Sequence, residues 1–114
     1  MLDAKIMNWI TLIIAGLFEV GFAFCLGKAR LSSGTSASFW WLGFLICLSL
    51  SMFLLYKATL TLPMGTAYAV WTGIGAVGTV ILGILVFKEP VHFWRIFFLS
   101  TLIISIIGLK FVTK

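Results

Sequence analysis

The sequence predicts an all-α membrane protein, a single domain of four transmembrane helices that spans residues 1–114. Of these residues, 62% are hydrophobic and 10% are charged, and the mean hydropathy is +1.22. Soluble domains, by contrast, contain about a quarter charged residues. Two stretches, 31–56 and 58–87, contain no charged side chain. Each is longer than the ~20 apolar residues that a helix needs to cross a bilayer, so both can form spans.

The first predicted span covers residues 8–27 and carries an acidic residue, Glu19, near its middle. A secretory signal has a shorter apolar core, about 7 to 15 residues, and no central acid, so we interpret this run as a retained span. Gly16, Phe22 and Ala23 recur with Glu19 at helical spacing. We expect this face of the helix to be directed toward the interior of the bundle.

The second predicted span covers residues 39–56. The serine-rich segment before it, 28–38, has the composition of a turn and is predicted to be a short loop. Aromatic side chains open and close the span, as is typical of the two interfaces of a bilayer; they are Trp40, Trp41 and Tyr56.

The third predicted span covers residues 64–87 and begins after Pro63, because proline suits the first turn of a helix and not its interior. Two glycines, Gly73 and Gly75, lie near its middle. Glycines let neighbouring helices approach closely and let a helix bend, so we predict a kink at this point.

The fourth predicted span, 92–112, is the shortest in uncharged residues. Only 14 of them separate Arg95 from Lys110. They make about 21 Å of helix, which is less than a bilayer core of ~30 Å. We therefore expect both cations to extend their side chains toward the two interfaces.

The eight lysine and arginine residues are scattered at the ends of the spans, which argues against nucleic-acid binding. Four spans place Lys5, Lys57, Lys110 and Lys114 on one side of the bilayer and Lys28, Arg30, Lys88 and Arg95 on the other. Because a lysine and arginine bias sets orientation, this balance predicts insertion in both orientations and pairing as an antiparallel dimer, unless the balance arose by chance. Four helices are also too few to enclose a substrate cavity, so transport would require an oligomer.

Glu19 is the principal candidate for function. A carboxylate inside a bilayer costs several kcal/mol and by default indicates a substrate or proton pathway. The two other acidic residues, Asp3 and Glu89, lie at segment ends. In the second span, Ser51 can donate to a substrate or to Glu19, or back to the carbonyl one turn earlier, which is the more common arrangement.

In the third span, Tyr68, Trp71 and Gly75 lie on one helical stripe. Tyr68 and Trp71 each combine an apolar ring with one hydrogen-bond donor, which suits a site for a planar or bulky cation. Alternatively, they are core aromatics whose donors meet neighbouring helices. The spacing does not separate these two interpretations.

The sequence has no nucleotide-binding loop, so transport would have to run on an ion gradient. Cys25 and Cys47 fall inside predicted spans without a CxxC spacing, and we interpret them as packing residues. We therefore expect no cofactor, no metal and no enzymatic activity.

Three motifs stand at corresponding places in the predicted helices: AGLFEV at 15–20, PMGTAYAVWTGIGAVG at 63–78 and IIGLK at 106–110. They resemble the motifs of the small multidrug resistance family, and most closely its guanidinium-exporter branch. The resemblance extends over residues 9–110. It implies an antiparallel, dual-topology homodimer in the bacterial inner membrane that exports guanidinium and related guanidinyl cations in exchange for protons.

The resemblance also assigns roles to single residues. It implies that Glu19 is the carboxylate shared by protons and substrate. The other residues implied to line the binding site are Gly16, Ser51, Tyr68, Trp71 and Phe22, and the implied hinge of the third helix is Gly73 with Gly75.

Two positions depart from the guanidinium-exporter branch. Phe22 stands where that branch usually has Trp, and Gly27 stands where it usually has Lys, with Lys28 one residue later. Two alternatives therefore stay open: an exporter of quaternary ammonium or other hydrophobic cations, and one subunit of a paired heteromeric transporter. In a further alternative, the chain stabilises a membrane partner that supplies a cation to Glu19.

Overall fold

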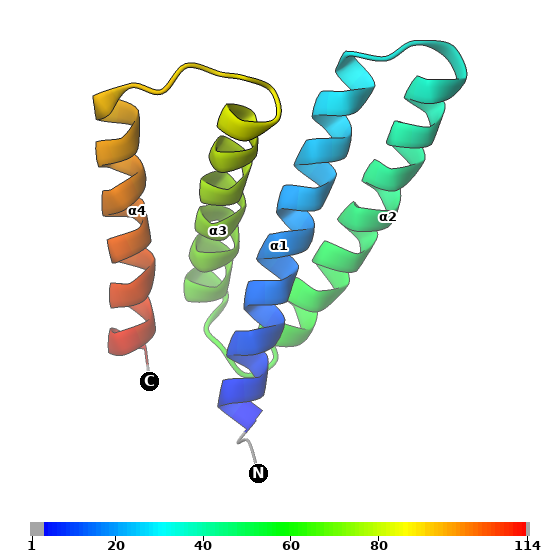
Figure 1. Cartoon of the computed structure of the whole chain (residues 1–114). Coiled ribbons are helices and arrows are strands. Elements are labelled where there is room, and N and C mark those ends of the chain that lie inside the picture. Colours follow the sequence, from blue (N-terminus) through cyan, green and yellow to red (C-terminus); the bar gives the residue numbers. More distant parts are fainter. Residues whose placement is uncertain (1–3, 114) are drawn as a thin grey trace.

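The computed structural model describes residues 4–113 and folds them into four helices (Figure 1). The helices are α1 (Ala4–Arg30), α2 (Gly34–Ala58), α3 (Met64–Leu85) and α4 (Phe93–Val112). Each contains a segment long and apolar enough to cross a membrane; these segments are Ile6–Arg30, Gly34–Ala58, Met64–Leu85 and Phe93–Val112. The prediction of an all-α protein with four spans is confirmed.

The connection between α1 and α2 is shorter than the sequence suggests. Helix runs to Arg30 and resumes at Gly34, so most of the segment predicted as a loop is helical. Two of its hydroxyl groups bond back to helix carbonyls: Ser32 Oγ donates to Lys28 O at 2.8 Å, and Ser38 Oγ donates to Gly34 O at 3.4 Å. Both helices therefore extend past the predicted spans.

The boundaries of α3 follow from proline and backbone geometry. Pro63 precedes the first residue of α3 and accepts a hydrogen bond from Ala67 N at 2.9 Å. After α3, the backbone of Lys88 has a φ of 55°, a left-handed conformation that is uncommon for a residue with a β-carbon. This residue reverses the chain before Pro90, and α4 begins at Phe93.

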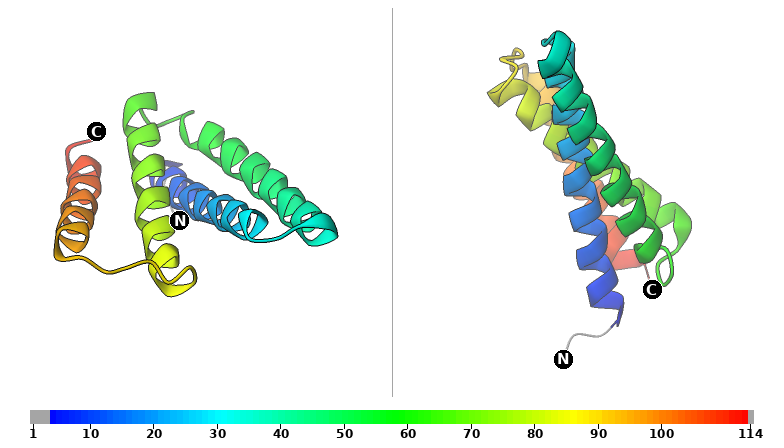
Figure 2. Two further views of the ribbon diagram at one scale, coloured as in Figure 1. Left: turned by 90° about the horizontal axis from the view of Figure 1, so that it is seen from above. Right: turned by 90° about the vertical axis from the view of Figure 1, so that its right-hand side faces the viewer.

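The four helices lie in the spatial order α2, α1, α3, α4 (Figures 1 and 2). Helix α1 packs along α2 and also against α3, whereas the backbone of α4 approaches only α3 among the helices. The buried core joins the first half of α1 to the second half of α2 and the first half of α3; its members are Trp9, Leu12, Ala15, Leu55, Ala58, Leu62, Ala67, Val70 and Trp71. No residue of α4 is buried.

Small residues bring the helices close together. Cys47 Sγ packs over Gly21, and Cys25 Sγ packs over Gly43, so each helix of the α1–α2 pair receives a side chain of the other. The thiols thus serve as packing groups where close helix approach supplies van der Waals contact. They also lie next to one another across this interface.

The cations lie at the ends of the helices with aromatic rings beneath them. The Nζ atom of Lys28 is 5.7 Å from the ring centre of Phe24, and that of Lys110 is 5.7 Å from the ring centre of Trp9. This is the arrangement expected of side chains that extend toward a membrane interface. The side chains of Lys5 and Lys114, which enter the predicted charge balance, lie outside the described part of the structure.

Candidate functional site

The carboxyl group of Glu19 lies inside the interface between α1 and α3, against the backbone of Gly75. A β-carbon at Gly75 would overlap Oε1 and Cδ of Glu19, so the glycine provides the space that the carboxyl group occupies. Oε1 is inaccessible to solvent and has no hydrogen-bond partner in residues 4–113. An unpartnered polar atom in an apolar interface is costly, and a proton or a cation on the carboxyl group would lower that cost.

One helical turn away, a hydrogen-bond chain joins α1, α2 and α3. Ser51 Oγ on α2 donates to the carbonyl of Ala15 on α1 at 2.7 Å, and Trp71 Nε1 on α3 donates to Ser51 Oγ at 2.9 Å. Ser51 is 0% exposed and Trp71 is 6% exposed. A hydroxyl group has one proton, and here Ala15 receives it, so Ser51 bonds neither back along its own helix nor to Glu19.

These hydrogen bonds show where the indole donor of Trp71 goes. Its indole donor meets a neighbouring helix, as expected of a core aromatic, and the ring is fixed in one orientation. Tyr68 lies next to it, with the two ring centres 5.5 Å apart. Unlike Trp71, Tyr68 is 54% exposed in the single chain. The aromatic stripe therefore runs from the buried core out to a free surface.

Gly16 and Phe22 flank Glu19 on α1. The side chain of Ile74 packs over Gly16, which makes this glycine a close-contact position between α1 and α3. Phe22 packs edge-on against Phe44 of α2, with ring centres 5.6 Å apart. Phe22 therefore contributes to the α1–α2 interface, although it follows Glu19 by less than one turn.

Gly73 and Gly75 face different helices. Gly75 receives Glu19 of α1, whereas the side chains of Ile106 and Leu102 on α4 pack over Gly73. Helix α3 is continuous from Met64 to Leu85 through both positions. The two glycines thus let one short stretch of α3 contact α1 on one side and α4 on the other.

The structure brings Glu19, Gly75, Ser51 and Trp71 into two adjacent layers of the bundle, with Tyr68 at the exposed margin. Sequence reasoning missed the carbonyl of Ala15, which fixes Ser51. Because every residue has a backbone carbonyl, no residue type could have indicated this one. In residues 4–113, no cluster of three or more His, Cys, Asp and Glu side chains could hold a metal ion.

The family model described as Small Multidrug Resistance protein matches residues 7–103. The chain belongs to the small multidrug resistance family. As a member of this family with four membrane-spanning helices, it is a multi-pass protein of the inner membrane. The resemblance seen in the sequence motifs is thereby confirmed.

Relatives within the small multidrug resistance family match nearly the whole chain. A protein named guanidinium exporter from Yersinia pseudotuberculosis is 48% identical over 108 residues, which are 91% of this chain and 97% of the relative. A guanidinium exporter from Escherichia coli (strain K12) is 42% identical and covers 94% of this chain and 99% of its own length. A probable guanidinium efflux system subunit GdnD from Bacillus licheniformis is 43% identical, with 94% and 100% covered.

Proposed function

We propose that this protein is a proton-coupled antiporter that exports guanidinium and related small guanidinyl cations across the bacterial inner membrane. The relatives named guanidinium exporters support the substrate, since they match over nine-tenths of the chain. Their names describe transport, and we propose that this chain is likewise a transporter and not an enzyme. The observation that carries the mechanism is the buried, unpartnered carboxyl oxygen of Glu19.

A buried carboxylate has two neutral states available to it. It can hold a proton as a carboxylic acid, or it can pair with a cation. Guanidinium is planar and offers two parallel N–H groups, which match the two oxygens of a carboxylate, whereas an ammonium group offers a single point charge. A carboxyl group that binds a proton excludes the cation, and one that binds the cation excludes the proton.

Mutual exclusion at Glu19 accounts for coupled exchange. While the site changes sides, the charged and empty carboxylate is the costly state, because its buried oxygen Oε1 has no hydrogen-bond partner in residues 4–113. In a dimer with two Glu19 carboxyl groups, the site crosses with a proton on each of them or with one guanidinium ion held between them, so each exchange moves net charge. Alternating access then converts inward proton movement into outward guanidinium movement.

The neighbouring residues have positioning roles in this proposal. Ser51 holds the ring of Trp71 in place, and Tyr68 continues the aromatic surface toward the open side of α3. Aromatic faces stabilise cations that lie over them. Gly16 lets α1 and α3 approach closely, which positions Glu19 in their interface. Phe22 packs against α2 and forms the side of the site that faces this helix.

We further propose that the working unit is an antiparallel homodimer with two Glu19 carboxyl groups. Three features support it: α4 buries no residue in the single chain, Tyr68 of the proposed site is exposed, and the lysine and arginine residues are balanced between the two sides. In such a dimer the inward-facing and outward-facing states are related by an exchange of conformations between subunits. Gly73 and Gly75 would act as the hinge of α3 in this exchange.

A second candidate has a specific observation in its favour. One relative of 43% identity is named as a subunit of an efflux system, which favours a paired, heteromeric transporter over a homodimer. An alternative substrate is a quaternary ammonium or other hydrophobic cation. Such a cation would be favoured if Phe22 leaves the binding site wider than a tryptophan at this position would. Both alternatives keep Glu19 as the shared binding group.

Guanidinium-evoked current in proteoliposomes that contain only this chain tests the proposal. We expect a current that depends on the pH gradient and disappears in Glu19→Gln, with both proteins shown by gel filtration to form the same oligomer. A quaternary ammonium compound assayed in parallel should evoke a smaller current. Undiminished, pH-dependent guanidinium transport by Glu19→Gln would contradict the mechanism, and a current seen only after co-expression with a second subunit would contradict the homodimer.

A further inference from the structure

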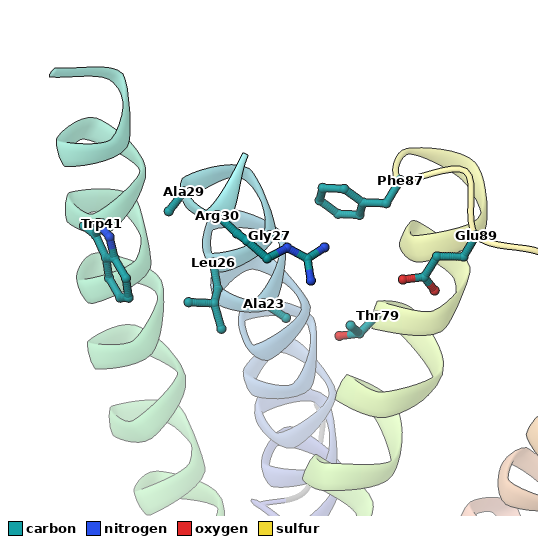
Figure 3. A pocket seen from close by; sticks show the side chains of 9 residues that line it. All are labelled: Ala23, Leu26, Gly27, Ala29, Arg30, Trp41, Thr79, Phe87 and Glu89. Atoms are coloured by element: carbon teal, nitrogen blue, oxygen red, sulfur yellow. The ribbon is translucent and has the colours of Figure 1, made fainter. Parts of the chain in front are cut away.

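A second acidic residue, Glu89, lines a cavity at the end of the bundle where α1 and α3 terminate (Figure 3). The cavity has a volume of about 480 Å³. Its lining includes Ala23 and Arg30 of α1, Trp41 of α2, Thr79 of α3, and Phe87 and Glu89 from the connection between α3 and α4. Glu89 is the only acidic side chain in this lining, and its carboxyl group points into the cavity.

The cavity lies one helical turn beyond the Glu19 site along both helices. Ala23 follows Glu19 by one turn of α1, and Thr79 follows Gly75 by one turn of α3. Helices α1 and α3 run in the same direction (Figure 1), so both steps lead toward the same end of the molecule. The lining of the cavity therefore begins one turn, about 5 Å of helix rise, beyond the positions of Glu19 and Gly75, on the side where α1 and α3 end.

The backbone directs Glu89 toward this cavity. Lys88, with its positive φ, turns the chain back toward α3, and Glu89 N donates to the carbonyl of Gly83 at 3.0 Å. The carboxyl group then lies over Gly83, where a β-carbon would overlap Oε1. A left-handed residue and a glycine together fix the position of this side chain.

Glu89 already binds a guanidinium group of the protein itself. Arg95 Nη2 contacts Glu89 Oε1 at 2.6 Å, and Arg95 Nη1 donates to the carbonyl of Pro90 at 3.1 Å. Within residues 4–113, the second carboxylate oxygen of Glu89 accepts no hydrogen bond. The side chains of Arg95 and Glu89 are 29% and 40% exposed, so the pair is accessible to a small cation.

We propose that Glu89 is a peripheral substrate site, at which a free guanidinium ion displaces the side chain of Arg95 on its way to or from Glu19. This inference rests on the proposed function. The substrate and the Arg95 side chain carry the same planar group with the same parallel N–H donors, so the carboxylate that accepts one accepts the other. Exchange between them replaces one ion pair by an equivalent one.

Arg30 limits how long a cation stays at this site. Its guanidinium group also points into the cavity from α1, on the side opposite Glu89, and the ion pair of Glu89 in the described residues is to Arg95 and not to Arg30. A second positive charge across the cavity weakens cation binding without abolishing it. A site on a transport path must bind its ion weakly enough to release it. In an antiparallel dimer, each membrane face would present one such cavity.

The transport test compares Glu89→Gln with Arg95→Gln in the full-length protein, with Lys57→Gln, in the last turn of α2 at the other end of the bundle, as a control for the loss of one positive charge. We expect Glu89→Gln to raise the KM for guanidinium by about threefold or more at an unchanged maximal rate, as is usual for a partly exposed ion pair. Arg95→Gln should lower the KM because it removes the competing group. If the pair only stabilises the loop, the two variants break the same contact and shift the KM in the same direction, which would overturn the proposal.

A binding measurement tests the site without transport. In Glu19→Gln protein, titration with guanidinium chloride, against sodium chloride at matched ionic strength, should shift the NMR signal of the Arg95 side-chain N–H groups as they are displaced. The shift should be absent in the Glu19→Gln, Glu89→Gln double variant. An Arg95 signal that does not respond to guanidinium would overturn the proposal even if Glu19-dependent transport is established. A wild-type protein that transports no guanidinium would instead contradict the proposed function.

Discussion

The carboxyl group of Glu19 on α1 occupies the space that a side chain at Gly75 on α3 would fill. The acid and the glycine are therefore one structural unit, although 55 residues of sequence separate them. Because the glycine has no side chain, the carboxyl group can enter the interface, where Oε1 has no hydrogen-bond partner in residues 4–113. The position of the proposed binding group thus depends on Gly75, which contributes no functional group to the site.

Replacement of Gly75 by alanine should displace the Glu19 carboxyl group. The new methyl group would overlap Oε1, so the side chain must rotate or α1 and α3 must separate. We expect about 1–3 kcal/mol of destabilisation, the usual cost of inserting a methyl group into a packed interface. Guanidinium transport should fall by roughly tenfold or more, because small displacements of a binding group have large effects on rate.

Gly65→Ala is the matched control on the same helix. A β-carbon at Gly65 has no neighbour within 4 Å, so the substitution should change stability by no more than about 1 kcal/mol and leave transport intact. Thermal unfolding in detergent and flux in proteoliposomes measure the two effects. Equal behaviour of the two variants would show that Gly75 has no special relation to Glu19.

Ser51→Ala should destabilise the protein by about 1–3 kcal/mol, because it removes the bond to Ala15 and leaves the indole N–H of Trp71 buried without a partner. Ser49 lies on the same helix, is exposed, and only bonds back to Leu45 O at 2.8 Å, so Ser49→Ala is the control. A double-mutant cycle with Trp71→Phe should give a coupling energy for Ser51. Additive effects of Ser51→Ala and Trp71→Phe would contradict a direct bond between them.

Gly27 and Phe87 form a second contact of this kind near the cavity. The Phe87 ring packs over Gly27, in the volume of a β-carbon. Gly27→Leu should therefore lower the free energy of unfolding by about 1–3 kcal/mol, through overpacking. The additional substitution Phe87→Ala should restore much of that loss, since it removes the ring that overlaps. A double variant less stable than Gly27→Leu would show that Phe87 stabilises the fold by another contact.

The balanced charges give a prediction about orientation. Added arginines at Ser33 and Thr35, in the connection between α1 and α2 and the first turn of α2, should bias insertion toward one orientation. Added arginines at Thr59 and Thr61, between α2 and α3, should bias it the other way. Each variant alone should lose transport, and co-expression of the two should restore it. Full transport by a single-orientation variant, with orientation measured by cysteine labelling from each side, would exclude an antiparallel dimer.

Much of the fold could be predicted because the bilayer restricts it. A chain of this hydropathy must satisfy its backbone hydrogen bonds within helices, and the breaks at Pro63 and at 88–90 are visible in the sequence. The connection at 28–38 was less predictable. Its serines have the composition of a turn, but Ser32 and Ser38 bond back to helix carbonyls, and only residues 31–33 lie outside helix.

The sequence by itself determined the four spans, the family, and Glu19 as the exceptional residue, because an acid in an apolar span is costly wherever its helix lies. Only the tertiary structure decided what each side chain contacts. Helical spacing places Tyr68, Trp71 and Gly75 on one stripe. Packing nevertheless leaves Tyr68 exposed, makes Trp71 a hydrogen-bond donor to Ser51, and places Gly75 against the carboxyl group of Glu19. Spacing fixes directions around one helix, whereas contacts depend on the distance and rotation between helices, which arise from the packing of the whole bundle.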